Sequence, residues 1–430
     1  MSNFVFVLDT TKRSLNPVHP GTARHLLKQG KAAVFRRYPF TLILKDACPE
    51  VPVQAVELRL EPGSQVTGIA IVQADKVLFS AELTHRGRQI QRALLSRRQL
   101  RKKRRSRKTR YRKSRFLNRT LPEGWLAPSL QHRVQTTMTW VNRLCKFAPV
   151  GSIVQELAKF DLQLIQNSVS QPSDLGKVEE QQNGLQAYEV KAYLTEKFHH
   201  QCVYCNAKDV PLAIAHSNLS SCRGSGRVPD LVLICQSCQQ AQGNQTMQDF
   251  LSGQPNLLKR VVAKLEMPLN GASVVSPTQW ALLKALKQTG LPIHTGSRGK
   301  TNFNRARLGL PQKPWLGAAC VGEVDTLKIL TQQPLLITAK GHGTRQMCGT
   351  NKYGFPIRHR SRVQVHRGFQ TGDIVTAMVT AGQKVGFYVG RVLCRASGSF
   401  DMTTKAGRVS GINHKYCQVI HKKDGYRYSF

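Results

Sequence analysis

The chain has 430 residues, and its 64 Lys and Arg residues outnumber its 24 Asp and Glu residues to give a formal net charge of +40. A globular protein with this excess repels itself unless a polyanion neutralises it, so we expect nucleic acid as the partner, with an anionic membrane surface as the alternative. No apolar run approaches the roughly 20 residues that span a bilayer, which excludes a membrane-spanning protein. Repeats and heptads typical of solenoids and coiled coils are absent, and the N-terminus has no signal-peptide pattern.

The first fifth of the chain predicts a series of short strands. Residues 4–8 and 40–44 are strand candidates, and the stretch "HPGTARHLLKQGKAAVF" between them has a helical pattern. The tight turns "EPGS" and "QAD" join the next three strand candidates, so these should form an antiparallel meander. The three candidates lie at 56–60, 66–72 and 76–83.

The segment 86–119 is strongly basic and contains no acid, with 17 Lys or Arg among its 34 residues. Arg and Lys are good helix formers and the segment has no Pro, so we expect a long helix that becomes well ordered against phosphate. A disordered basic tail is the alternative, but the internal position and apolar residues such as Leu94 and Leu95 favour a docked helix. The cations expected to contact nucleic acid are Arg97, Arg98, Arg101, Lys102, Lys103, Arg104, Arg105, Arg107, Lys108, Arg110, Arg112, Lys113 and Arg115.

Helices and strands then alternate toward the C-terminus. The stretch "GSIVQELAKFD" has the pattern of a buried strand that ends at Glu156, and a polar linker occupies 168–186. From about residue 333 onward, Gly-punctuated strands indicate a β-rich region. Helices are expected at 131–147, 188–198, 277–287 and 315–330.

Four of the eleven cysteines form two C-x-x-C pairs, "CVYC" and "CQSC", which are separated by 29 residues. Four thiolates in two such knuckles suit a closed tetrahedral zinc site, which leaves no open position for chemistry. The doubled motif disfavours a redox pair, and four unrelated core cysteines remain the alternative. We therefore predict a reducing compartment and a structural zinc ion held by Cys202, Cys205, Cys235 and Cys238.

The stretch between the two knuckles resembles the ββα-metal unit of HNH nucleases. In that family an acid and a later Asn hold one magnesium ion beside a His that acts as general base. Here Ala215 takes the place of the acid and Gln239 that of the later Asn, while His216 is the His and Asp230 replaces a supporting Asn. Because Ala215 offers no ligand atom, we expect His216 to be a relic or a core residue and not a catalyst.

Taken together, these parts resemble the IscB proteins, transposon-encoded relatives of the type II CRISPR nucleases, along nearly the whole chain. The family's N-terminal motif is usually Pro-Leu-Met-Pro. The motifs that carry the resemblance are "LNPVHPGTARHLLKQGKAAVFRRYPF", the basic helix, "QEL", "AYEVKAYLTEKF", "LGAACVG" and "NKYGFPIRHRSR" followed by "GFQTGDIV".

The resemblance implies RNA-guided DNA binding, in which a structured guide RNA, called omega RNA, pairs with one strand of double-stranded DNA while the protein reads a short flanking motif. It also implies a cytoplasmic bacterial protein that is nucleoid-associated when bound to DNA. Arg358, Arg360 and Arg362 are basic residues of the C-terminal region that could contribute to contacts with the guide RNA or the flanking motif.

The implied fold class is α/β: a split RNase H-like (RuvC-like) core with an Arg-rich bridge helix, a zinc-knuckled HNH-like ββα insert and a β-rich C-terminal domain. The corresponding segments are a PLMP-like N-terminal domain (1–54), RuvC-like part I (55–85), the bridge helix (86–120), RuvC-like part II with a linker (121–185), the insert (186–255), RuvC-like part III (256–332) and the C-terminal domain (333–430).

The RuvC-like site of the family uses converging carboxylates and a nearby His to hold two magnesium ions about 4 Å apart. At those positions this chain has Glu61 in place of an Asp, the retained Glu156, Pro314 in place of the His and Gly317 in place of the last Asp. Glu61 moves its carboxylate outward by roughly 1.5 Å. Since Gly317 supplies no ligand at all, we expect that magnesium does not bind productively.

We therefore expect a protein that is not an enzyme and that acts by occupying its target, as a transcriptional repressor or by recruiting a partner such as a transposition complex. One alternative is a nickase or weak nuclease that uses Glu61, Glu156 and an unseen ligand, for which Asp325 lies too far beyond Gly317. Another is a guide-RNA-binding protein without DNA targeting. A pseudogene is disfavoured because the cysteines, the basic helix and the C-terminal motifs are intact.

Overall fold

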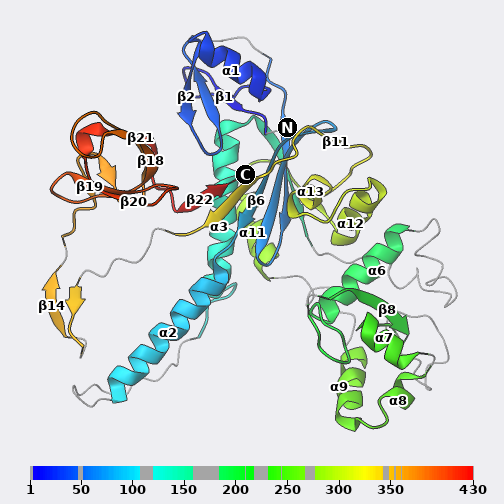
Figure 1. The fold of residues 1–430 in the computed structure, drawn as a ribbon. Helices are drawn as coiled ribbons and strands as arrows, with labels where there is room; N and C mark the ends of the chain where they lie inside the picture. Colours follow the sequence, from blue (N-terminus) through cyan, green and yellow to red (C-terminus); the bar gives the residue numbers. More distant parts are fainter. Residues whose placement is uncertain are drawn as a thin grey trace. The chain divides into compact units, whose positions relative to one another are not determined.

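The computed structural model describes most of the chain, which Figure 1 draws as a ribbon. The chain divides into two compact units. The first unit comprises residues 1–3, 54–145 and 149–334, and the second comprises residues 4–53, 146–148 and 335–430. The described residues are 3–46, 52–106, 120–157, 184–208, 210–216, 231–243, 245–266, 277–341, 348–352, 355–359 and 361–429.

A mixed sheet forms the centre of the first unit. The strands β4 (Val56–Pro62), β5 (Val66–Gln73) and β6 (Lys76–Thr84) form the expected antiparallel meander, which confirms that prediction. Next to β4 lies β7 (Val150–Glu156) in parallel, and β10 (Ile293–Gly296) continues the sheet parallel to β7. The strand order in this unit is therefore β10-β7-β4-β5-β6, with the short β11 (Lys328–Ile329) also pairing with β6.

Helices of the first unit pack onto this sheet through small and apolar side chains. The predicted helix at 131–147 is α3 (Pro128–Phe147), and that at 277–287 is α11 (Pro277–Lys287), on which Leu283 packs against Leu157 and Ile293. Ala318 and Ala319 of α13 (Pro314–Ala319) pack against β5 and β6. The helix α12 (Arg298–Arg307), which the sequence pattern missed, follows β10.

The helix predicted at 315–330 is wrong beyond its first turns. The helix α13 begins at Pro314, whose fixed φ suits the first helical position, and it ends at Ala319. Gly322 then adopts a φ of +86°, a left-handed conformation that a glycine takes without strain and that does not continue a helix. The residues beyond it therefore turn away, and Asp325 lies exposed in a loop, not two helical turns along from Gly317.

The cysteine-containing insert is an α/β module with its own core. It consists of α6 (Gly184–Lys197), a two-stranded antiparallel sheet, α7, α8 (Met247–Phe250) and α9 (Pro255–Glu266). The strands are β8 (Leu212–His216) and β9 (Leu231–Cys235), and α7 spans Gln236–Gln242. Apolar side chains from every one of these elements form one continuous cluster, so the insert has a hydrophobic core to itself. The helix predicted at 188–198 corresponds to α6, and most of the predicted linker before it lies outside the described residues.

The basic segment forms the helix α2 (Gly87–Ser106), which Figure 1 shows as one uninterrupted ribbon. Residues 107–119 of the predicted helix lie outside the described residues. Within α2 no described side chain is buried, and Leu95 and Leu100 are more than half exposed. Leu95 and Leu100 are therefore largely uncovered by the described parts of this protein, whereas Leu94 is half-buried.

The N-terminal part of the second unit contains a three-stranded sheet of order β1-β3-β2 beside α1. The elements are β1 (Phe6–Leu8), α1 (Pro20–Lys28), β2 (Ala32–Arg36) and β3 (Thr41–Leu44). The continuous helical pattern predicted at 19–35 is therefore wrong in its second half, which forms β2. Gly30, with a φ of +74°, follows the C-cap of α1 and directs the chain into β2.

The C-terminal part of the second unit is β-rich, as predicted. Five strands form a sheet of order β20-β19-β18-β17-β21 around a small core, drawn in orange and red in Figure 1. These strands are β17 (Ile374–Val379), β18 (Gly386–Leu393), β19 (Ser399–Thr403), β20 (Arg408–Asn413) and β21 (Cys417–His421). The remaining strands pair two by two: β12 (Leu335–Ala339) with β22 (Tyr426–Ser429), β13 (Cys348–Thr350) with β14 (Pro356–His359), and β15 (Val365–His366) with β16 (Phe369–Gln370).

None of the helices in the described ranges combines the length and the apolar character needed to cross a membrane. This finding agrees with the absence of a long apolar run in the sequence.

Candidate functional site

Two acids and a glycine form a row across the meander. Glu61 on β4 pairs with Gly68 on β5, and Gly68 pairs with Glu82 on β6. Directly opposed residues of antiparallel strands project from the same face of a sheet, so the two carboxylates flank the glycine on one face. Glu61 can be identified from the sequence and Glu82 cannot, because only the strand register brings these two acids to the same level.

The first turn of α13 lies directly over Gly68. A Cβ atom at this glycine would meet the Pro314 carbonyl oxygen at 1.9 Å, so only glycine allows the helix to approach the strand so closely. The Trp315 backbone N–H donates a hydrogen bond to the Glu82 carboxylate. Because the first N–H groups of a helix have no partner within the helix, Glu82 holds α13 in place by capping its N-terminus.

The Glu61 carboxylate occupies the space beside Gly317. A Cβ atom at Gly317 would lie 2.1 Å from Glu61 Oε2 and 2.9 Å from Glu61 Oε1, far inside van der Waals contact. The two positions are therefore sterically coupled: the Glu61 side chain fits because position 317 has no side chain. Glu61 Oε2 is shielded from solvent and accepts no hydrogen bond from the described residues.

Glu156 completes the predicted group from the neighbouring strand. Leu60 pairs with Gln155, which places the ends of β4 and β7 side by side, and Glu156 is only 3% exposed. Arg298, at the start of α12, brings its Nε atom to 4.0 Å from Glu156 Oε1. Burial raises the pKa of Glu61 well above its usual value, the Glu156 carboxylate raises it further, and the guanidinium groups of Arg298 and Arg305 oppose the rise.

The structure thus brings all four predicted RuvC-like positions together, but they do not fit a pair of magnesium ions. Two-metal sites need several carboxylate oxygens that converge on open space. Here one carboxylate is packed against Gly317, Glu156 lies beside a guanidinium, and Glu82 caps a helix. Among the described residues, the acids near Glu61 do not form a group of three or more with ligand atoms in close reach of one another.

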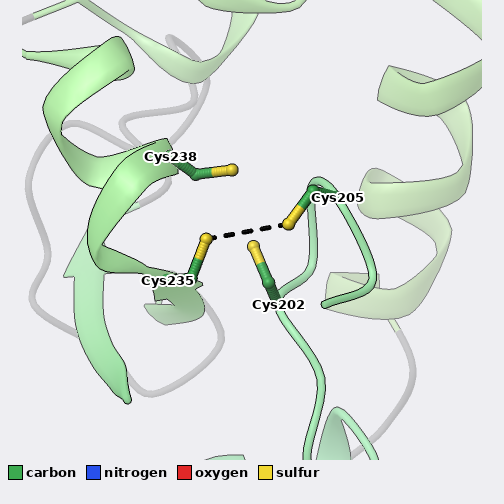
Figure 2. A group of neighbouring side chains, drawn as sticks. All are labelled: Cys202, Cys205, Cys235 and Cys238. Carbon is green, nitrogen blue, oxygen red and sulfur yellow. Dashed lines mark hydrogen bonds between the residues drawn. The ribbon is translucent and has the colours of Figure 1, made fainter. Parts of the chain in front are cut away.

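The four predicted cysteines do form such a group. Their Sγ atoms all lie within 4.8 Å of one another, and Figure 2 shows the four thiols directed toward one point. The Sγ atoms of Cys205 and Cys235 are 3.6 Å apart, close to the edge of about 3.8 Å that four bonds of about 2.3 Å would give a zinc tetrahedron. The cysteine cluster therefore fits a zinc ion.

Local structure explains why these cysteines converge. Cys202 and Cys205 lie on a tight turn that Asn206 closes with a φ of +56° and an N–H bond to the Cys202 carbonyl. Cys235 ends β9 and precedes α7, which places Cys238 in the first helical turn. The Val203 N–H donates to the Leu233 carbonyl and ties the turn to β9. A contact with the Ser237 hydroxyl at 3.1 Å lowers the pKa of Cys235, which favours the thiolate that binds metal.

The residues compared with an HNH site lie on or beside β8, β9 and α7, two strands followed by a helix. Ala215 packs against the hydrophobic core of the insert, and Gln239 is exposed on α7. His216 is the last residue of β8, where it pairs with Leu231, while Asp230 lies outside the described residues. Ala215 is thus an apolar residue in a core environment.

Several of the cations predicted to bind nucleic acid lie on described elements. Among the residues of α2, the side chains of Arg97, Arg98, Arg101, Lys102, Lys103 and Arg105 are exposed. Arg358 is exposed on β14 and lies against Gly349, and Arg362 is also exposed. Arg104 also lies on α2, where only its backbone is described. The remaining predicted cations lie outside the described residues: Arg107, Lys108, Arg110, Arg112, Lys113, Arg115 and Arg360.

Comparison with known proteins gives one family model and several solved structures. Residues 5–177 match the family model described as RRXRR protein. This match spans the N-terminal sheet, the meander, the basic segment and β7. No curated protein matches the chain significantly.

The solved structures that match are much longer than this chain. Streptococcus thermophilus Cas9 in complex with the AGAA PAM is 14% identical with a TM-score of 0.23, and the match covers 62% of this chain and 32% of that one. The Type II-C Cas9 enzyme from Actinomyces naeslundii is 14% identical with a TM-score of 0.17, covering 44% and 26%. The chain thus spans about a third or less of the length of these structures.

Proposed function

We propose that this protein is an RNA-guided DNA-binding protein of the IscB type that has lost nuclease activity and acts by occupying its target. Support for the guided binding comes from the IscB-like motifs along the chain and from the net charge of +40. The exposed cations of α2 suit contacts with a phosphate backbone. Support for an RNase H-like core comes from the strand order, in which an antiparallel meander is followed by two parallel strands on the side of β4.

One observation carries the loss of cleavage: the Glu61 carboxylate lies where a side chain at position 317 would project. An Asp side chain at position 317 would collide with the Glu61 carboxylate where it now lies. The carboxylates of this site therefore do not converge on one point. Two-metal cleavage depends on such convergence, and a misplacement of about 1 Å can cost about 100-fold in rate. The protein therefore keeps the scaffold of the site without its chemistry.

We further propose that the cysteine cluster holds one structural zinc ion. The four thiolates close the coordination sphere, so this zinc supports the fold of the insert and takes no part in cleavage.

The test requires the guide RNA that copurifies with the protein, sequenced and then transcribed. Gel shifts should show tight binding of the loaded protein to a matched duplex and much weaker binding to a mismatched one. Equal affinity for both duplexes would contradict guided DNA targeting and would support a protein that binds its guide RNA only. A matched supercoiled plasmid incubated with magnesium should remain uncut, and any guide-dependent cut or nick would overturn the loss of activity.

A residual nickase is a second candidate, because Glu82 is a further carboxylate close enough to raise the pKa of Glu61. If Glu61, Glu82 and Glu156 rearranged around magnesium, they would supply three carboxylates. A nick in the plasmid assay that disappears in both Glu156→Gln and Glu82→Gln would support this candidate. The variant Glu323→Gln is the matched control, since that side chain is 90% exposed and lies outside the group of Glu61, Glu82 and Glu156, which we call the acidic row.

A further inference from the structure

One face of the five-stranded sheet in the second unit carries exposed apolar side chains. Met378 on β17 and Phe387 on β18 are 62% and 66% exposed, and they are directly paired across the two strands. The next pair on this face is Thr376 and Val389, and Val389 is 41% exposed. We call Met378, Phe387 and Val389 the apolar platform.

The platform is not part of the hydrophobic core of the sheet. The alternate residues of the same strands, among them Val375, Ala377 and Val392, point to the other face and are buried with Phe400. A two-faced antiparallel sheet normally carries polar residues on its solvated side. Here both faces of the β17–β18 pair are apolar, so the exposed one is suited to a partner.

The charge around the platform points to the chemistry of that partner. Residues 335–430 contain 16 Lys and Arg, no Glu and only three Asp. All three carboxylates have partners within the second unit. Asp373 accepts hydrogen bonds from the backbone N–H groups of Gln370 and Lys423, Asp401 pairs with Arg395 and Arg408, and Asp424 pairs with Arg36.

Two cations bracket the platform along the chain. Lys384 precedes β18 and donates to the Ser410 carbonyl, and Arg391 follows Val389 and donates to the Gly372 carbonyl at 3.1 Å. Both side chains are exposed, and these carbonyl contacts orient them. In chain order, the exposed ring of Phe387 thus has one cation before it and one after it, which suits a polymer that offers apolar faces and negative charges in alternation.

We propose that the apolar platform binds unpaired nucleotides, with a base stacked on Phe387 and the flanking phosphates held by Lys384 and Arg391. This inference rests on the proposed function and specifies how part of the nucleic acid is held. A duplex stacks its own bases and offers a flat sheet mainly phosphates, whereas an unpaired strand can place a base on an exposed ring. Unpaired nucleotides therefore use both the apolar and the cationic features of this face.

The direct test measures binding of the full-length protein to two fluorescent probes of equal length, an unpaired oligonucleotide and a blunt duplex, at several salt concentrations. Phe387→Ala should weaken binding of the unpaired probe by about 5- to 150-fold and leave the duplex nearly unchanged. Phe387→Leu keeps apolar area but removes the ring, so it should lose most of the same affinity. Val34→Ala, at a 54% exposed site on β2, is the matched control and should change neither affinity.

Salt dependence separates stacking from charge. Phe387→Ala should leave the slope of log affinity against log salt unchanged, whereas Lys384→Gln with Arg391→Gln should reduce it by roughly 1.4. Equal losses of the unpaired probe and the duplex in Phe387→Ala, or no loss in either, would overturn the proposal. So would self-association of the wild type that Phe387→Ala abolishes, because the platform would then bind a second copy of the chain.

The proposed function can fail separately. If guide-dependent targeting is intact and Phe387→Ala binds the unpaired probe like the wild type, only the platform assignment is wrong. If the loaded wild type does not distinguish matched from mismatched DNA while Phe387→Ala weakens the unpaired probe, the platform stands and the guided targeting fails.

Discussion

The first unit contains two groups of side chains of the kinds that bind metal ions, four cysteines and three glutamates, and the two groups differ in how their ligand atoms are arranged. In the cysteine cluster, two segments separated by 29 residues bring four Sγ atoms within 4.8 Å of one another. In the acidic row, the strands bring carboxylates to one end of the sheet, but each carboxylate has a local neighbour that is not a second ligand. The geometry of the cysteine cluster therefore suits a metal ion, whereas each carboxylate of the acidic row interacts with a neighbouring protein group.

Under the proposed function, this difference explains how a nuclease site loses its chemistry while the sheet that carries it stays folded. A structural metal site contributes its binding energy to folding, so a lost cysteine would unfold the insert. A catalytic site contributes little to folding, and substitutions there can become mutually compatible, as a long side chain at 61 and none at 317 are. The acidic row could therefore drift without damage to the sheet, whereas the cysteine cluster could not.

The largest effect should follow removal of the cysteine cluster. Structural zinc contributes on the order of 10–16 kcal/mol in small zinc domains, so Cys205→Ser or a strong chelator should unfold the insert. Metal analysis of the purified protein should give one zinc per chain, and limited proteolysis should cut the insert only in the variant. Cys145→Ser, at a half-buried free cysteine on α3, is the control and should retain zinc. If the insert of Cys205→Ser stays folded, the cysteine cluster does not stabilise the insert, and the proposed difference between the two sites is wrong.

The second prediction concerns the acidic row: restoring the ligands expected at a nuclease site should restore cleavage. The triple variant Glu61→Asp, Pro314→His, Gly317→Asp shortens residue 61, which vacates the space that Asp at 317 needs. With guide RNA and magnesium, this variant should cleave matched plasmid about 100-fold faster than the wild type. Gly317→Asp alone should not cleave, since its side chain meets Glu61. A folded but inactive triple variant would mean that the surrounding scaffold has drifted as well.

The coupling between positions 61 and 317 can be measured as stability. Gly317→Ala places a Cβ atom 2.1 Å from Glu61 Oε2 and should cost about 1–3 kcal/mol through overpacking. Alanine also favours a helix over glycine by about 1 kcal/mol, and this gain cancels when the substitution is made in two backgrounds. In a double-mutant cycle by denaturant unfolding, Gly317→Ala should be less costly after Glu61→Ala, with a coupling of about 1 kcal/mol or more. Additive effects would show that the two positions are independent.

The smallest effect concerns pH. Burial, and then the Glu156 carboxylate, raise the pKa of Glu61 above its usual value of 4.5. A group whose pKa is raised in the folded state contributes stability below the unfolded pKa, and this contribution is lost as the pH rises through the folded pKa. Glu61→Gln should therefore gain unfolding free energy relative to the wild type as the pH increases above about 4.5.

The control for this pH dependence is Glu323→Gln, whose side chain is 90% exposed. The pH dependence that Glu61→Gln shows beyond that of Glu323→Gln reports the buried Glu61 carboxylate. If Glu61→Gln behaves in the same way, the Glu61 carboxylate is not held in the buried position beside Gly317.

Local patterns in the sequence predicted much of the fold. The meander, α3, α11 and the β-rich C-terminal region follow from alternation, helical periodicity and turn residues, which act over a few neighbouring positions. The two errors lie where a glycine interrupts a helical pattern: at Gly30, where a strand follows, and at Gly322, after α13 has already ended. Periodicity alone did not predict those ends, because an apolar helix face and a short apolar strand look alike over five residues.

The sequence by itself determined which side chains the chain possesses: four cysteines with zinc-knuckle spacing and a basic segment without acids. It also has an alanine, a proline and a glycine at the positions that the resemblance to IscB proteins assigns to a nuclease site. Only the tertiary structure decided what the remaining acids do. Strand register placed Glu82 level with Glu61, the close approach of α13 over Gly68 turned Glu82 into a helix cap, and the missing side chain at 317 made room for the Glu61 carboxylate. Spacing along the chain can list candidate ligands, but convergence on one point is a property of packed elements far apart in sequence.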